Sequence, residues 1–323
     1  MVNTFIERNV ADWKPTHKKL AELLLDPKTP LFQRYRALFS LKNLADKPSV
    51  DIIIQCLREE KESDLLLHEL TYCLGQMKSK DAINVLCETM ADPSLHAMVR
   101  HEAAESLGAI SQLDTIPELE KFLNDDCKPL ADTCLLAIEK IKYDHSPDKQ
   151  KEDPAPEEAV HTSIDPVPAT TNTKSIAELR TMLCDQEAPL WKRYRALFAL
   201  RDINNDDAVH ALAEAMETDV VSSLLRHEIG FVFGEMQNPA SVPSLSRVLA
   251  NTKEEPMVRH EAAEALGSVA TPEVFEILKK FTDDPVKIVR DSCIVALDMF
   301  DYEQSGEFQY AIVPKEGEGE KAF

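Results

Sequence analysis

The sequence contains the same design twice, and the offset between the two copies is constant. The stretch LFQRYRALFSLKNL, which begins at Leu31, corresponds to LWKRYRALFALRDI, which begins at Leu190. MVRHEAAESLGAI at Met98 and MVRHEAAEALGSV at Met257 have the same separation and differ at only three positions. Self-similarity at a fixed spacing is the signature of a repeat architecture, and it restricts the fold more than any other feature of this chain. We therefore expect two halves of similar structure.

Each half also repeats internally, with a period of about 33 residues, which is typical of helical-repeat proteins. His68 and His101 mark this period in the first half, and His227 and His260 mark it in the second. The register continues for one unit on either side, which gives four units per half and eight in all. Each unit holds two stretches with apolar residues at helical spacing. Because such a unit cannot bury its apolar faces alone, neighbouring units must stack. The sequence predicts an all-α fold, an α-solenoid of eight helical hairpins in two pseudo-symmetric halves.

The boundaries of the halves follow from the ends of the repeats. The N-terminal half, the segment between the halves, the C-terminal half and the tail are assigned to residues 1–143, 144–174, 175–300 and 301–323. The intervening segment is rich in Pro, Thr and charge and lacks an apolar period, which predicts a flexible linker. Ser175 and Glu178 fit a capping box that opens the second half. The tail is predicted to be disordered apart from a docked strip at FQYAIV.

Charge and composition exclude several classes of function. The chain has 36 Lys and Arg against 57 Asp and Glu, a net charge of −21. Nucleic acid and anionic membranes are therefore excluded as direct partners, and cationic partners are favoured. With only eight glycines, the chain has no glycine-rich phosphate-binding string. No apolar run approaches the roughly 20 residues of a membrane span. Seven cysteines without a CxxC pair, and no signal-peptide core, predict reduced thiols and a cytoplasmic location, with the nucleus as a second option.

Four histidines are each followed directly by glutamate, at the same slot of their repeat and only in the two central units of each half. They are His68-Glu69, His101-Glu102, His227-Glu228 and His260-Glu261. A structural pair copied by duplication would recur in the same way. However, a solenoid holds equivalent slots about 8–10 Å apart on adjacent helices, so the two histidines of each half should converge. Carboxylates crowded at such a place repel one another until protons or a cation relieve them. The pattern therefore predicts a metal site.

The ligand types restrict the metal. Histidine and carboxylate without thiolate are not typical of structural zinc or iron–sulfur sites. Two histidines and one carboxylate with open positions form the set used by O₂-activating iron. Two such sets facing each other, one from each half, would give a two-metal site. Adjacent residues on a helix diverge by about 100°. The histidine and glutamate of one pair therefore need not bind the same ion, and some of the glutamates would instead contact substrate.

Two further glutamates are candidates to orient the ligands. Glu105 and Glu264 each follow a histidine of the pattern, His101 and His260, by four residues and thus share its helix face. A carboxylate there could accept the second imidazole N–H and fix the tautomer. The alternative is an ion pair with the arginine that precedes each histidine.

At this point the sequence resembles a known family. Eight HEAT-type helical pairs in two halves, with HE dipeptides in units two and three of each, resemble deoxyhypusine hydroxylase over nearly the whole chain. The resemblance implies hydroxylation of the deoxyhypusine side chain on one lysine of the hypusine-bearing translation initiation factor. It also implies O₂ and a di-iron centre, two ions per chain bridged by O₂, with ligands from the four HE pairs. Among the glutamates, Glu102 and Glu261 are favoured as ligands, and Glu69 and Glu228 as contacts to the substrate amine. We expect a monomer.

Two alternatives remain open at the level of sequence. One is a non-enzymatic HEAT-repeat scaffold whose concave face binds a basic protein partner. The other is a repeat-type lyase that acts on a tetrapyrrole chromophore. The restriction of the HE pairs to the central units favours the enzyme, because a scaffold does not need it.

Overall fold

The computed structural model describes residues 13–147, 149, 161, 163–170, 174–307 and 310–312, and these residues form helices and connecting loops without strands. The N-terminal half contains α2 (Pro15–Leu25), α3 (Leu31–Leu44), α4 (Lys47–Glu59), α5 (Asp64–Gln76), α6 (Ile83–Ala91), α7 (Ala97–Ile110), α8 (Ile116–Glu120) and α9 (Lys128–Asp144). The C-terminal half contains α10 (Ile176–Cys184), α11 (Leu190–Ile203), α12 (Asp206–Thr218), α13 (Ser223–Met236), α14 (Val242–Ala250), α15 (Pro256–Val269), α16 (Val274–Lys279) and α17 (Lys287–Ser305). Short 3₁₀ turns precede α6, α8 and α14 at Lys80–Ala82, Leu113–Thr115 and Pro239–Ser241.

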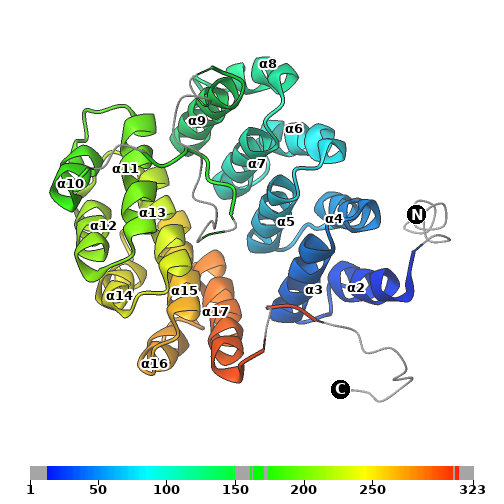
Figure 1. The fold of residues 1–323 in the computed structure, drawn as a ribbon. Coiled ribbons are helices and arrows are strands. Elements are labelled where there is room, and N and C mark those ends of the chain that lie inside the picture. The colour runs from blue at the N-terminus through cyan, green and yellow to red at the C-terminus, as the bar shows by residue number, and fades with distance from the viewer. Residues whose placement is uncertain are drawn as a thin grey trace.

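The helices form eight hairpins arranged in a ring, with the odd-numbered helices toward its centre and the even-numbered helices outside (Figure 1). Consecutive inner helices pack side by side within each half, and the halves meet at two seams, where α9 contacts α11 and α17 contacts α3. The predicted all-α solenoid of eight hairpins is confirmed. No helix in the described part of the chain is both long and apolar enough to cross a bilayer.

Local signals fix where the helices begin. Ser175 and Glu178 form the predicted capping box at the start of α10. Ser63 and Ser222 cap the inner helices α5 and α13, because each serine side chain accepts a hydrogen bond from a backbone N–H of the first turn. These caps set the register of the helices that carry two of the HE pairs.

Glycines allow the inner helices to approach closely. A Cβ on Gly267 of α15 would lie 2.6 Å from the carbonyl oxygen of Ala296 in α17, and a Cβ on Gly75 of α5 would lie 2.8 Å from Cα of Ser106 in α7. Gly234, the counterpart of Gly75 in the second half, has more room, with its nearest neighbour at 3.4 Å. The equivalent glycines of the two halves therefore differ in how much space a side chain would have.

We predict that Gly267→Ala destabilises the protein by about 1–3 kcal/mol, because the added methyl group must push α17 away from α15. The control Gly234→Ala should be neutral or slightly stabilising, since it adds helix propensity without a clash. Urea unfolding followed by circular dichroism measures both values. Equal stabilities for the two variants would contradict the packing described.

A buried arginine in the first and third repeats of each half joins its own hairpin to the next one. Each guanidinium donates from Nε to a backbone carbonyl at the end of the outer helix of its own hairpin. It also pairs with a carboxylate that lies just beyond the next outer helix. The pairs are Arg34–Glu60, Arg100–Asp125, Arg193–Asp219 and Arg259–Asp284. Loss of one partner from a buried pair of this kind is destabilising, since the other charge remains without compensation.

The ion pairs predict a loss of stability in acid. Burial alone would raise the pKa of Asp284, but Arg259 and the backbone N–H of Val286 outweigh it and hold that pKa below its usual value. The pKa of Glu60 is also lowered, against burial, by backbone N–H groups and Arg34. Because the folded pKa values are depressed, this stabilisation is complete above the unfolded values near pH 4 and is lost as the pH falls through the folded values.

We therefore expect the contribution of these ion pairs to the free energy of unfolding to be nearly constant from pH 7 to pH 5 and to fall by roughly 2 kcal/mol or more by pH 3. Urea titrations at each pH test this expectation. Asp284→Asn should be less stable than the wild type at pH 7, and the difference should shrink at pH 3. A difference that does not depend on pH would contradict the role assigned to this pair.

Part of the segment between the halves packs against the helices, although its composition predicts a flexible linker. Residues 163–170, here called the linker segment, bridge α5 of the N-terminal half and α11 of the C-terminal half. Val167 is fully buried, and the Thr170 N–H donates to the carbonyl of Arg195. The expectation of a flexible linker over 144–174 therefore does not fit these residues. Their contacts are mostly backbone and charged groups, which leave no apolar period in the sequence.

The described part of the tail docks at the seam between α17 and α3. α17 extends to Ser305, five residues beyond the predicted end of the half. Tyr310 donates a hydrogen bond to Asp298, and the backbone of Ile312 bonds to Ser40 of α3. A docked strip is thus found at residues 310–312, while the remainder of FQYAIV lies outside the described residues.

Candidate metal centre

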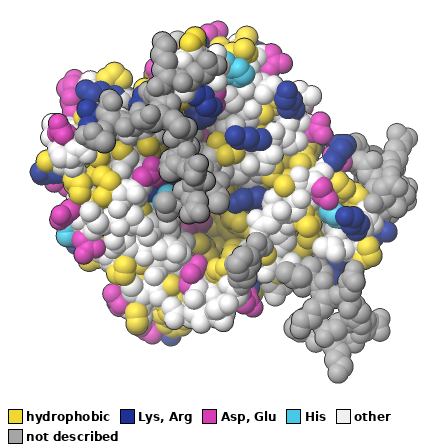
Figure 2. Space-filling view, viewed as in Figure 1, with side chains coloured by type: hydrophobic (Ala, Val, Ile, Leu, Met, Phe, Trp, Pro, Cys, Tyr) yellow, Lys and Arg dark blue, Asp and Glu magenta, His cyan; other side chains and the backbone are white. Residues whose placement is uncertain are grey.

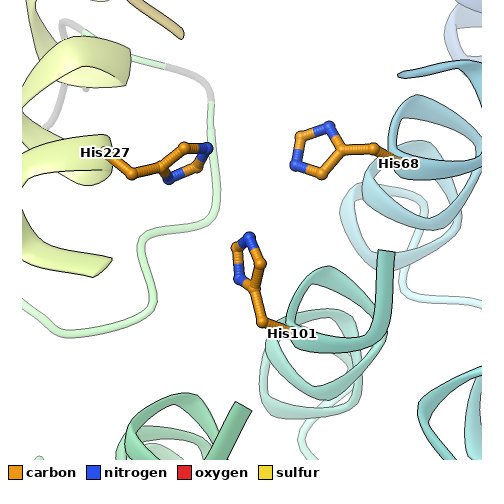
Figure 3. Close-up of side chains that lie close together, drawn as sticks. All are labelled: His68, His101 and His227. Carbon is orange, nitrogen blue, oxygen red and sulfur yellow. The ribbon is translucent and has the colours of Figure 1, made fainter. Parts of the chain in front are cut away.

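The four histidines of the HE pairs converge at the centre of the ring. They extend from α5, α7, α13 and α15, and their exposed fractions are 4%, 0%, 5% and 0% in chain order. Figure 3 shows His68, His101 and His227 directed toward one another from three helices. The ring centroids of His68 and His260 are 5.3 Å apart, as are those of His101 and His227. Contacts across the halves are therefore as close as those within a half, where the distances are 5.9 and 5.3 Å.

The sequence predicted that the two histidines of each half would converge and that the two sets would face each other. The structure gathers all four histidines into one cluster, with contacts across the halves as close as those within a half. A set of three nitrogens within 4.8 Å of one another comes from His68, His101 and His227, and so spans both halves. Two further sets of close ligand atoms are His227, His260 and Glu261, and His101, Glu102 and Glu105.

None of the eight ring nitrogens in this cluster has a hydrogen-bond partner among the described residues. An unpaired buried polar atom costs about 1–3 kcal/mol. Five of the eight lie 3.3–3.8 Å from a glutamate oxygen without forming a hydrogen bond, so the penalty at this place would be severe unless something else binds these atoms. Imidazole nitrogens beside carboxylates are the donor set of transition-metal sites. The residues present therefore fit a bound metal, and the cluster is a candidate metal centre.

The glutamates of the HE pairs occupy two different environments. Glu102 Oε2 lies 3.4 Å from Nε2 of His68, and Glu261 Oε2 lies 3.3 Å from Nε2 of His227, so each faces the histidine of the preceding repeat. Glu228 makes no hydrogen bond or ion pair among the described residues, although it is only 3% exposed. Glu69 is intermediate, with Oε1 3.5 Å from Nδ1 of His68. These positions agree with the preference for Glu102 and Glu261 as ligands, which stays a prediction.

Burial and mutual charge govern protonation in the cluster. Burial, and then the neighbouring imidazoles, lower the pKa of His101 and His260 well below the usual value, so both rings are neutral with lone pairs free to bind a metal. Burial lowers the pKa of His68 as well, but the Glu102 and Glu69 carboxylates outweigh it and raise that pKa overall. Burial raises the pKa of Glu228, and the charges of Glu105 and Glu102 raise it further. A cation at this place would relieve the repulsion among the carboxylates.

Glu105 and Glu264 lie beside the cluster as expected. Oε1 of Glu264 is 3.6 Å from Nδ1 of His260 and accepts a hydrogen bond from Ser292. The alternative ion pairs with the preceding arginines are not formed in the described residues, because Arg100 and Arg259 bind aspartates instead. The proposed role of the two glutamates in orienting imidazoles stays a prediction.

A cavity of about 320 Å³ opens onto the cluster. Glu69 and Glu228 line it, together with Tyr72 and Phe231, whose rings meet edge to face across the two halves with centroids 5.9 Å apart. Figure 2 shows hydrophobic side chains in the hollow at the centre of this face of the ring. The cavity therefore combines apolar walls with acidic groups at its inner end.

Several cavity residues were not anticipated from the sequence. Lys42, Gln76, Arg201 and Glu235 line or border it, and Asp165 reaches it from the linker segment. The duplication offered a signal for Gln76 and Glu235, which both follow an HE histidine by eight residues on the same helix. The linker segment offered none, because no repeat or period extends through it.

The comparisons with known proteins first define the class. The family model described as HEAT repeats matches residues 50–139 and 221–298, and the one described as PBS lyase HEAT-like repeat matches residues 33–59 and 192–218. The chain is a HEAT-repeat protein with a histidine–carboxylate cluster at the centre of its ring. The lyase match is limited to a repeat unit in each half, so it bears on the architecture.

Full-length relatives then identify the family. Deoxyhypusine hydroxylase of Schizosaccharomyces pombe is 46% identical over 300 residues, covering 90% of this chain and 93% of the relative. The human enzyme of that name is 41% identical over 292 residues, with coverage of 90% and 93%. The structure of human deoxyhypusine hydroxylase in complex with glycerol matches with a TM-score of 0.82 and 40% identity, covering 89% of this chain and 97% of the other. The chain belongs to the deoxyhypusine hydroxylase family and is an enzyme, so the non-enzymatic scaffold is set aside.

Proposed function

We propose that this protein hydroxylates the deoxyhypusine side chain on the hypusine-bearing translation initiation factor and thereby completes hypusine formation. The reaction uses O₂ and two iron ions per chain. The observation that carries the proposal is the set of eight histidine ring nitrogens that have no hydrogen-bond partner among the described residues. They are buried among carboxylates at the inner end of the cavity. The names of the full-length relatives support the substrate. The protein acts as a monomer, in the cytoplasm or the nucleus.

The four histidines, with Glu102 and Glu261, would hold the metal. When bound, iron would activate O₂ so that one oxygen atom enters a C–H bond and the other leaves as water, with two electrons and two protons drawn from an external reductant and solvent. The protein's own groups bind and orient the substrate. Glu69 and Glu228 bind ammonium groups of the long aliphatic amine, which fixes the position of its C–H bonds relative to the histidines. Tyr72 and Phe231 contact the methylene groups and exclude water from them.

The test measures metal and product together. Wild-type protein from iron-supplemented cells should contain about two irons per chain, absorb visible light, and add one oxygen atom to the deoxyhypusine-bearing factor with O₂ and a reductant, as detected by mass spectrometry. His68→Ala should lose iron and product. His210→Ala, at an exposed histidine of α12, is the matched control and should retain both. Full iron content and full hydroxylation in His68→Ala would refute the proposal.

A further inference from the structure

The cavity is built from duplicated positions that differ in charge. Lys42 and Arg201 occupy equivalent positions in the two halves, and so do Gln76 and Glu235. Each pair contributes one residue to the N-terminal side of the cavity and one to the C-terminal side. Where the N-terminal half has a neutral amide, the C-terminal half has a carboxylate. The two walls of a nearly symmetric site are therefore electrostatically different.

The C-terminal wall carries a net negative charge. Arg201 binds both oxygens of Asp165, at 2.6 and 2.8 Å, and one oxygen of Glu235 at 2.9 Å. One guanidinium thus faces two cavity carboxylates, and Asp202, which is largely exposed, adds a third contact on the outer side. Ser163 donates a hydrogen bond to the other oxygen of Glu235. The linker segment therefore supplies Asp165 and holds Glu235 in place.

The N-terminal wall carries a positive charge. The Lys42 ammonium lies 5.0 Å from the ring centre of Phe39 and 5.4 Å from that of Tyr72, and it has no ion pair with any described residue. Gln76 is bound by the linker segment, since its Oε1 accepts from the Ile164 N–H at 2.8 Å and its Nε2 donates to the Ile164 carbonyl. This wall therefore offers a cation over aromatic rings and a neutral amide.

Glu228 lies on the negative side of this division. Its side chain is buried, lines the cavity and has no partner in the described part of the chain. Besides Glu105 and Glu102, the charges that act on it are those of Asp165 and Glu235. Glu69, its counterpart, contacts His68, and the position equivalent to Glu235 on its helix is the neutral Gln76. A cation placed beside Glu228 would gain the attraction of the whole wall.

We propose that Asp165, Glu235 and Glu228 form an ammonium-binding subsite. A pseudo-symmetric cavity would otherwise allow a bound amine two opposite orientations, and the opposed charges of the two walls select one of them. The terminal ammonium of an alkyl-amine side chain binds on the C-terminal side, where three carboxylates face one guanidinium, and its attachment to the protein lies on the N-terminal side, where Lys42 offsets the charge of Glu69. Asp165 and Glu235 act as positioning residues. The identity of the alkyl amine rests on the proposed function, whereas the subsite itself does not.

Putrescine tests the subsite without catalysis. Calorimetry with the metal-loaded protein should show that Asp165→Asn and Glu235→Gln each raise the Kd of putrescine about tenfold, because each removes the net charge of the wall. Glu235→Gln is nearly isosteric and reproduces the residue at Gln76, so it preserves the fold. Lys42→Gln should change the Kd in the opposite direction. Glu214→Gln, which removes a carboxylate of α12 that pairs with Arg180 and does not line the cavity, is the control and should leave the Kd unchanged.

Steady-state kinetics on the deoxyhypusine-bearing factor supply the second measurement. Both carboxylate variants should raise KM about tenfold, with kcat within about threefold of the wild type and an unchanged metal content. Unchanged Kd values in both variants, an equal effect of Glu214→Gln, or loss of metal would overturn the subsite. If the putrescine results are as expected but the wild type does not hydroxylate the factor, the proposed function fails and the subsite stands.

Discussion

Glu261→Gln is expected to lose metal and bring hydroxylation below detection, whereas Glu228→Gln is expected to keep its metal and lose kcat/KM by about a hundredfold. The two glutamates occupy the same slot of successive repeats, but only Glu261 lies within 4 Å of imidazole nitrogens, those of His227 and His260. An amide in its place removes one negative charge from the candidate ligand set. Glu228 is instead directed into the cavity, where an amide would leave a substrate ammonium without its counter-charge.

Metal analysis and kinetics on the same preparations distinguish the two effects. Glu102→Gln and Glu69→Gln are the matched variants in the N-terminal half and should behave like Glu261→Gln and Glu228→Gln respectively. Loss of metal from all four variants would mean that every HE glutamate is a ligand, contrary to the division made here. Full activity of Glu228→Gln would remove it from the substrate site.

Removal of the metal is expected to lower the melting temperature by about 6 °C. A ligand present at about a thousand times its Kd stabilises the folded state by about 4 kcal/mol, and with an unfolding entropy of about 2.1 cal/mol/K per residue the melting temperature of a chain of 323 residues shifts by about 1.5 °C for each kcal/mol. The cluster draws histidines from both halves, so the loss should weaken the contact between them. Without a cation, Glu102, Glu105 and Glu228 also repel one another.

Calorimetry before and after chelation measures this shift, and small-angle scattering reports whether the halves separate. Addition of iron should restore the original melting temperature. His68→Ala, which is expected to hold no metal, should not respond to the chelator. An unchanged melting temperature in the wild type after verified metal loss would contradict a metal that joins the halves.

The repeat pattern was sufficient to predict the helical hairpins and the convergence of the HE histidines, because the same spacing determines the stacking of helices and the positions of their side chains. It could not predict that His68 approaches His260 as closely as His227 approaches His260. That proximity depends on how the two halves close on each other at the α9–α11 and α17–α3 seams. Seam contacts join residues far apart in the sequence and leave no periodic signal.

The linker segment is a second part of the site that the sequence pattern could not predict. Composition around Asp165 indicates a linker, because Ser, Asp and Pro are typical of irregular chain. Its order comes from specific partners, Gln76 on one half and Arg201 on the other, whose positions depend on the closed ring. Repeat patterns reveal only residues that recur in both halves. They therefore gave no sign of the cavity wall that the linker segment forms, which has no counterpart in the other half.

The convergence of both copies on one cluster has a consequence for the duplication. Where each copy of a duplicated protein keeps a complete site, damage to one leaves the other working. Here the candidate ligands are divided between the copies, so neither retains a spare. Duplication has provided two complementary parts of a single site. A harmful substitution in either half should therefore impair the whole site, because the other half cannot replace the lost ligands.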